Sequence, residues 1–75
     1  MAQAASEIRR VTLSVGKHVY TSEIWRESEG SWALLKVQVH GVGVAEAIGF
    51  HGTSCLQVLQ RAEGVAVELI ARESH

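Results

Sequence analysis

The sequence predicts an α+β fold: a four-stranded antiparallel meander followed by one C-terminal helix packed on the sheet. Up to Gly52, apolar and polar residues alternate in short runs separated by glycine turns, which is typical of β-strands. After Gly52, polar residues recur at helical spacing as far as Arg72. With 75 residues, the chain makes one domain at most.

The first strand is predicted to run from about Ile8 to Val15. Its apolar face carries Val11, Leu13 and Val15, and its polar face carries Arg10, Thr12 and Ser14. Gly16 and Lys17 make a two-residue turn with glycine first, which favours a type II′ hairpin. The second strand then runs over residues 18–26, and a polar loop follows over residues 27–31.

The third strand is predicted over residues 32–40. Strict alternation puts Ala33, Leu35, Val37 and Val39 on one face, and Trp32, Leu34, Lys36, Gln38 and His40 on the other. A glycine turn or bulge at residues 41–43 leads into a fourth strand over residues 44–50. Two small residues of that strand, Ala45 and Ala47, would let the helix approach the sheet closely.

The helix is predicted from Ser54 to Arg72. Steps of four, three, four and four residues connect its polar positions, which keeps them on one side: Gln57, Arg61, Gly64, Glu68 and Arg72. Ser54 followed three residues later by Gln57 fits a capping box. The alternative is a short helix ending at Gly64 and a fifth strand over residues 65–69, since valine favours strands.

We expect residues 1–6 to be disordered and residues 7–75 to form the single small domain. The chain has one cysteine, Cys55, and no secretory leader pattern, so we expect a cytoplasmic protein. No apolar run approaches the roughly 18 residues of a membrane span. We therefore expect no membrane partner.

A subunit interface is the first functional prediction. The chain is 47% hydrophobic, yet a domain of this size buries only about 60% of its unfolded surface. The sheet face away from the helix would expose aromatic and aliphatic residues that need a cover, and a homo-oligomer, most simply a dimer, would provide it. The predicted interface residues are Tyr20, Ile24, Trp25, Trp32 and Leu34. Pairing of edge strands between subunits is an alternative contact.

Single-stranded nucleic acid is the alternative ligand. Tyr20, Trp25 and Trp32 would stack on bases, while Arg9, Arg10 and Lys36 would contact phosphates. Seven basic side chains against eight acidic ones do not favour binding by phosphate neutralisation.

Catalytic and metal chemistry has little support. His51 and Cys55 are four residues apart and would share a helical face, which suits zinc or a base and nucleophile, with His40 and Glu46 the only candidates to complete a metal site. The chain has no Asp, so calcium and magnesium sites are disfavoured. The glycine-rich residues 41–43 and 49–52 match no phosphate-binding motif. We therefore predict a non-enzymatic binding module without metal or cofactor.

Overall fold

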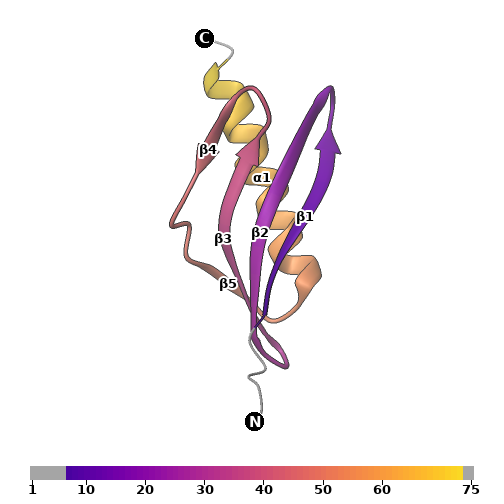
Figure 1. Ribbon diagram of the computed structural model, residues 1–75, viewed down its shortest axis with the longest axis vertical. Helices are drawn as coiled ribbons and strands as arrows, with labels where there is room; N and C mark the ends of the chain where they lie inside the picture. Colours follow the sequence, from indigo (N-terminus) through magenta and orange to yellow (C-terminus); the bar gives the residue numbers. More distant parts are fainter. Residues whose placement is uncertain (1–6, 74–75) are drawn as a thin grey trace.

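The computed structural model describes residues 7–73, so the expected disorder of residues 1–6 lies outside the described part. Its elements are β1 (Glu7–Val15), β2 (His18–Ser28), β3 (Ser31–Val39), β4 (Gly43–Ala45), β5 (Phe50–Gly52) and α1 (Cys55–Glu73). The strands form one antiparallel sheet in the order β1-β2-β3-β4, with β5 also paired to β3. The helix packs on one face of this sheet (Figure 1), which confirms the predicted α+β fold.

The β1–β2 hairpin follows the prediction closely. Its nine residue pairs run without a register shift from Glu7 opposite Arg26 to Val15 opposite His18. Gly16 has a φ of 59°, whereas Lys17 has no positive φ. Those are the φ signs of a type II′ turn, which suits the right-handed twist of the flanking strands.

A bulge in β3 overturns the predicted alternation of its side chains. Glu23 pairs with Lys36 and the next residue, Ile24, pairs with Leu34, so Leu35 is an extra residue. A single extra residue reverses which face the following side chains occupy. Leu34 and Val37 therefore both face the helix and are fully buried.

The predicted fourth strand is two short strands. β4 pairs with the end of β3 and β5 pairs with its beginning. Between them Ala47 has a φ of 54° and Gly49 a φ of 71°, which is left-handed backbone that a strand does not contain. The Ile48 amide instead donates a hydrogen bond of 3.2 Å to the carbonyl of Leu35, at the bulge.

The helix continues through Gly64 as far as Glu73, so the alternative with a fifth strand is wrong. Ser54 caps it as predicted: the Gln57 amide donates to Ser54 Oγ at 3.2 Å. The other half of the box is displaced by one residue, because Gln57 Oε1 accepts from the amide of Thr53 at 2.8 Å rather than from that of Ser54. The bond from Gln57 satisfies an amide that the helix start leaves unpaired, and the bond from Thr53 fixes the residue before the cap.

The core lies between the sheet and α1. Its buried members come from β2, β3 and α1: Tyr20, Ile24, Leu34, Val37, Val39, Val58, Ala62, Val65 and Ala66. Ser22 lies among them with 0% exposure, and within residues 7–73 its hydroxyl has no hydrogen-bond partner. Burial, with a smaller contribution from Glu63, raises the pKa of Tyr20 above its ordinary value.

The helix does not cover the sheet evenly. It packs mainly on β3 and least on β1. Figure 1 shows that α1 crosses the sheet obliquely, beginning beyond the lower half of β1 and ending beside β4. The closed end of the β1–β2 hairpin therefore has little helix over it.

Candidate functional site

Three of the five predicted interface residues lie in the core. Tyr20, Ile24 and Leu34 are at most 2% exposed and pack with the helix residues Val58 and Ala62. The prediction that they occupy the sheet face away from the helix is wrong. The bulge at Leu35 is the cause for Leu34, because the sequence places Leu34 and Val37 on opposite faces only if alternation is unbroken. Tyr20 and Ile24 lie in the core because the pairing of β2 with β1 puts them on the same face as Leu13.

The two tryptophans lie on opposite faces. Trp32 is on the helix side, half-buried, with the guanidinium groups of Arg9 and Arg26 at 6.0 and 5.9 Å from its ring centroid. Arg9 also donates to Glu7 at 2.9 Å, and that hydrogen bond raises the pKa of Arg9. Trp25 is half-buried on the far face, where it is paired with Ala33.

The residues predicted to bind nucleic acid do not form one surface. Arg10, Lys36 and Trp25 share the face away from the helix, as their pairing in the sheet requires. Arg9 is on the helix side, while Tyr20 is buried and leaves no ring face for a base. Stacking residues and cations are thus divided between the two sides of the sheet.

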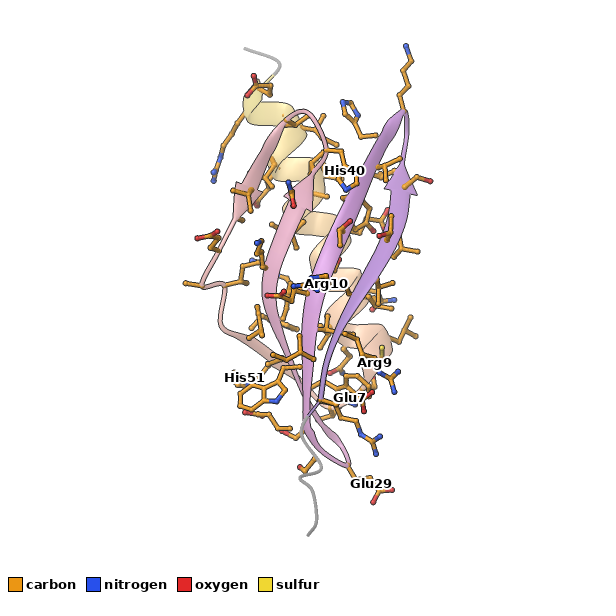
Figure 2. All side chains as sticks on the ribbon, in the orientation of Figure 1. Glu7, Arg9, Arg10, Glu29, His40 and His51 are labelled. Carbon is orange, nitrogen blue, oxygen red and sulfur yellow. The ribbon has the colours of Figure 1, made fainter. Side chains whose placement is uncertain are left out.

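The face away from the helix, which we call the open face, combines paired polar side chains with the exposed apolar side chains of Ile8, Val19 and Val44. Arg10 forms a salt bridge of 3.2 Å with Glu23. Thr21 Oγ1 lies 3.1 Å from Thr12 Oγ1 and 3.0 Å from His40 Nε2. Figure 2 shows Arg10 and His40 over the central strands of this face. Apolar side chains scattered singly among polar groups are ordinary on a protein surface.

His51 and Cys55, the candidate zinc or nucleophile pair, do not share a helical face. His51 is the middle residue of β5, not part of a helix, and its Nδ1 lies 3.7 Å from a carboxylate oxygen of Glu27 on the open face. Cys55 begins α1 and packs against the core. Within the described residues no three His, Cys or Glu side chains are grouped so that they could hold a metal ion.

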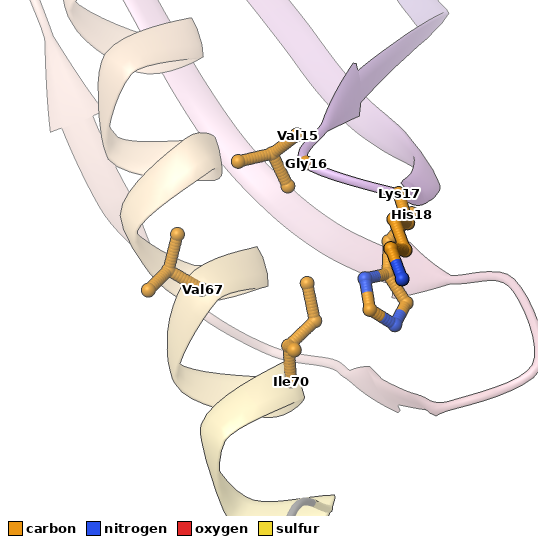
Figure 3. A pocket seen from close by; sticks show the side chains of 6 residues that line it. All are labelled: Val15, Gly16, Lys17, His18, Val67 and Ile70. Atoms are coloured by element: carbon orange, nitrogen blue, oxygen red, sulfur yellow. The ribbon is translucent and has the colours of Figure 1, made fainter.

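An uncovered apolar surface lies between the closed end of the hairpin and the second half of the helix; we call it the hairpin–helix surface. It includes a cavity of about 320 Å³ lined by Val15, Gly16, Lys17, His18, Val67 and Ile70 (Figure 3). Leu13 is 39% and Val67 48% exposed beside it. The surface is therefore apolar on its floor, with the cation Lys17 at its rim.

The free edge of β1 adjoins this surface. β1 is the first strand in the sheet order, and its outer side has no strand beside it in the described part of the chain. It carries no bulge and no proline over nine residues. Native proteins usually protect an edge of this kind, because its unpaired backbone groups are ready to add another strand.

Sequence reasoning found the apolar residues of this surface but assigned them to the core. Leu13 and Val15 alternate as a buried strand face should, and Ile70 lies on the apolar side of the helix. Leu13 remains 39% exposed because the oblique path of α1 leaves this end of the hairpin with little helix over it. Periodicity gives the inward side of each element but not the angle at which two elements cross.

No family model matches this chain, and comparisons with curated proteins and with solved structures give no match either. Within residues 7–73, α1 lacks the combination of length and apolar composition that crossing a bilayer requires. The function must therefore be argued from the surfaces described above.

Proposed function

We propose that this protein is a non-enzymatic module that associates with copies of itself through the hairpin–helix surface and the adjoining edge of β1. The supporting observation is the apolar surface left uncovered between Leu13, Val15, Val67 and Ile70. An uncovered apolar patch beside an open strand edge is typical of an interaction surface.

Self-association also agrees with the size of the chain. Among residues 7–73 the core has nine buried members, two of which are alanines. A domain below about 80 residues gains only a few kcal/mol from such a core. Burying Leu13 and Val67 against a second copy would add apolar area without lengthening the chain.

Single-stranded nucleic acid is the competing ligand. Trp25 would be its stacking residue, with Arg10 and Lys36 beside it on the open face. Arg10 is already paired with Glu23, and the chain is slightly acidic overall. Tryptophan fluorescence titrated with a homopolymer oligonucleotide at low salt tests this ligand, since phosphate contacts strengthen as salt falls.

Sedimentation velocity on three proteins tests self-association. We expect the unmodified chain to be a dimer and Leu13→Glu to weaken the dimer by about tenfold or more, because a carboxylate would be buried against apolar groups. Val19→Glu is the matched control, since Val19 is 41% exposed against 39% for Leu13 but lies on the open face. A monomeric unmodified chain, or equal effects of the two variants, would refute the proposal.

A further inference from the structure

The edge of β1 has a definite hydrogen-bonding pattern. Val15 and His18 close a two-residue turn, so they exchange two backbone hydrogen bonds. Hydrogen-bonded pairs then alternate along an antiparallel ladder. The odd-numbered residues of β1 therefore direct their backbone groups at β2. The even-numbered residues direct theirs at the free edge: Ile8, Arg10, Thr12 and Ser14.

We infer that the occupant of this edge is a second copy of the same strand, paired antiparallel about a two-fold axis at Thr12. This inference rests on the proposed function and specifies its geometry. In this register Thr12 faces Thr12 of the second copy, and Arg10 faces its Ser14. Val11 faces Leu13 of the second copy on the helix side, in the non-hydrogen-bonded pairs where side chains are closest.

The charges along β1 select this register. The helices of the two copies lie on the same side of the joined sheet only if the two-fold axis passes through a residue of β1. Alternative registers therefore place the axis at the neighbouring residues. Moved to Arg10, it would set two arginines directly opposite each other. Moved to Leu13, it would bring Arg9 level with Lys17 of the other copy. Like charges placed directly opposite destabilise a strand pair, whereas opposite charges and apolar pairs stabilise it.

Among the registers that pair at least seven residues of β1 from each copy, those about Val11 and Thr12 avoid these repulsions, and they differ in their side-chain partners. With the axis at Val11, Arg9 faces Leu13 and Glu7 faces Val15 of the second copy. With the axis at Thr12, Glu7 comes level with Lys17 in the hairpin turn of the second copy, each Val11 meets a Leu13, and Arg9 faces Val15. The register about Thr12 therefore sets one charged side chain of each copy opposite an apolar one, where the register about Val11 sets two, and it brings Glu7 near an opposite charge.

The oblique helix supports the same arrangement. The first turns of α1 extend beyond the lower half of β1, and the hairpin end of β1 has little helix over it (Figure 1). An antiparallel two-fold turns the second copy end for end, so its protruding first turns face the uncovered hairpin end of this copy. Leu56, which is 65% exposed in one chain, then faces the cavity beside Val15 and Val67.

Disulfide trapping tests the register. Every variant carries Cys55→Ala, so that an introduced cysteine is the only thiol. Hydrogen-bonded partners have Cα atoms about 5.5 Å apart, within the range of about 4.4–6.8 Å that a disulfide spans. We therefore expect Thr12→Cys to form a disulfide-linked dimer on mild oxidation. Val11→Cys is the control, because two Val11 residues would then be diagonal neighbours about 7–8 Å apart.

The outcomes separate the two proposals. A dimer by sedimentation that Thr12→Cys traps efficiently, and Val11→Cys does not, supports the register. A dimer trapped by Val11→Cys, or by neither cysteine, overturns the register about Thr12 and leaves self-association standing. A monomer at every concentration overturns both. Far-UV circular dichroism confirms that each variant keeps its fold.

Discussion

The buried hydroxyl of Ser22 destabilises this fold. Ser22 is 0% exposed, it lies across from Val11 and Val37, and no described residue accepts or donates a hydrogen bond to its Oγ. A buried hydroxyl without a partner costs about 1–3 kcal/mol. Ser22→Ala removes this oxygen and otherwise leaves the shape of the buried site unchanged.

We expect Ser22→Ala to increase the free energy of unfolding by about 1 kcal/mol, since the lower strand preference of alanine offsets part of the gain. For a domain of this size that is a rise of about 4–8 °C in Tm. Thermal and urea unfolding followed by circular dichroism measure it, at one fixed protein concentration because an oligomer's stability depends on concentration.

Ser28→Ala is the control for this experiment. Ser28 is exposed at the end of β2, so its replacement should change stability by less than about 0.5 kcal/mol. A Ser22→Ala protein that is no more stable than the unmodified chain would refute the reasoning. It would mean that the hydroxyl has a hydrogen-bond partner in solution.

Three other substitutions and one pH dependence test the packing. Gly64→Ala should stabilise the protein by about 1 kcal/mol in urea unfolding, because a Cβ there meets nothing and alanine favours helix; no gain would mean a helix broken at residue 64. Gly52→Ala should destabilise it by about 1–3 kcal/mol, because its Cβ would come within 2.9 Å of Gln57 Oε1, which caps the helix; an unchanged Tm would contradict this. Leu34→Glu should unfold the chain, as seen by circular dichroism, because it buries an unpaired carboxylate. Above pH 10 the unfolded chain loses the Tyr20 proton first, since burial raises the pKa of folded Tyr20, so stability should fall with rising pH; an equal fall in Tyr20→Phe would exclude Tyr20 as the cause.

The order of elements and the helix follow from local patterns that the sequence contains in full. The helix is recognisable because its polar positions keep to one side across Gly64, and its cap because Ser54 precedes Gln57 by three residues. The hairpin is recognisable because Gly16 supplies the positive φ that its turn requires. Each of these features depends on residues a few positions apart.

The candidate surface depends on two features that local patterns do not contain. The bulge at Leu35 arises where β3 must pair with β2 and also receive the amide of Ile48. It moves Leu34 to the core face. The exposure of Leu13 arises from the crossing angle of α1, which packing over the whole sheet decides. Val67 is exposed because it lies on the side of the helix opposite Val58 and Val65.

Sedimentation velocity of the unmodified chain beside Thr12→Pro tests the central claim most directly. Proline at Thr12 removes an N–H that points to the free edge and serves no bond within the hairpin, so edge strands tolerate it. We predict that the unmodified chain sediments at twice the 8.1 kDa of one chain and that folded Thr12→Pro sediments as a monomer. A monomeric unmodified chain, or a Thr12→Pro protein that remains a dimer, would contradict self-association through β1.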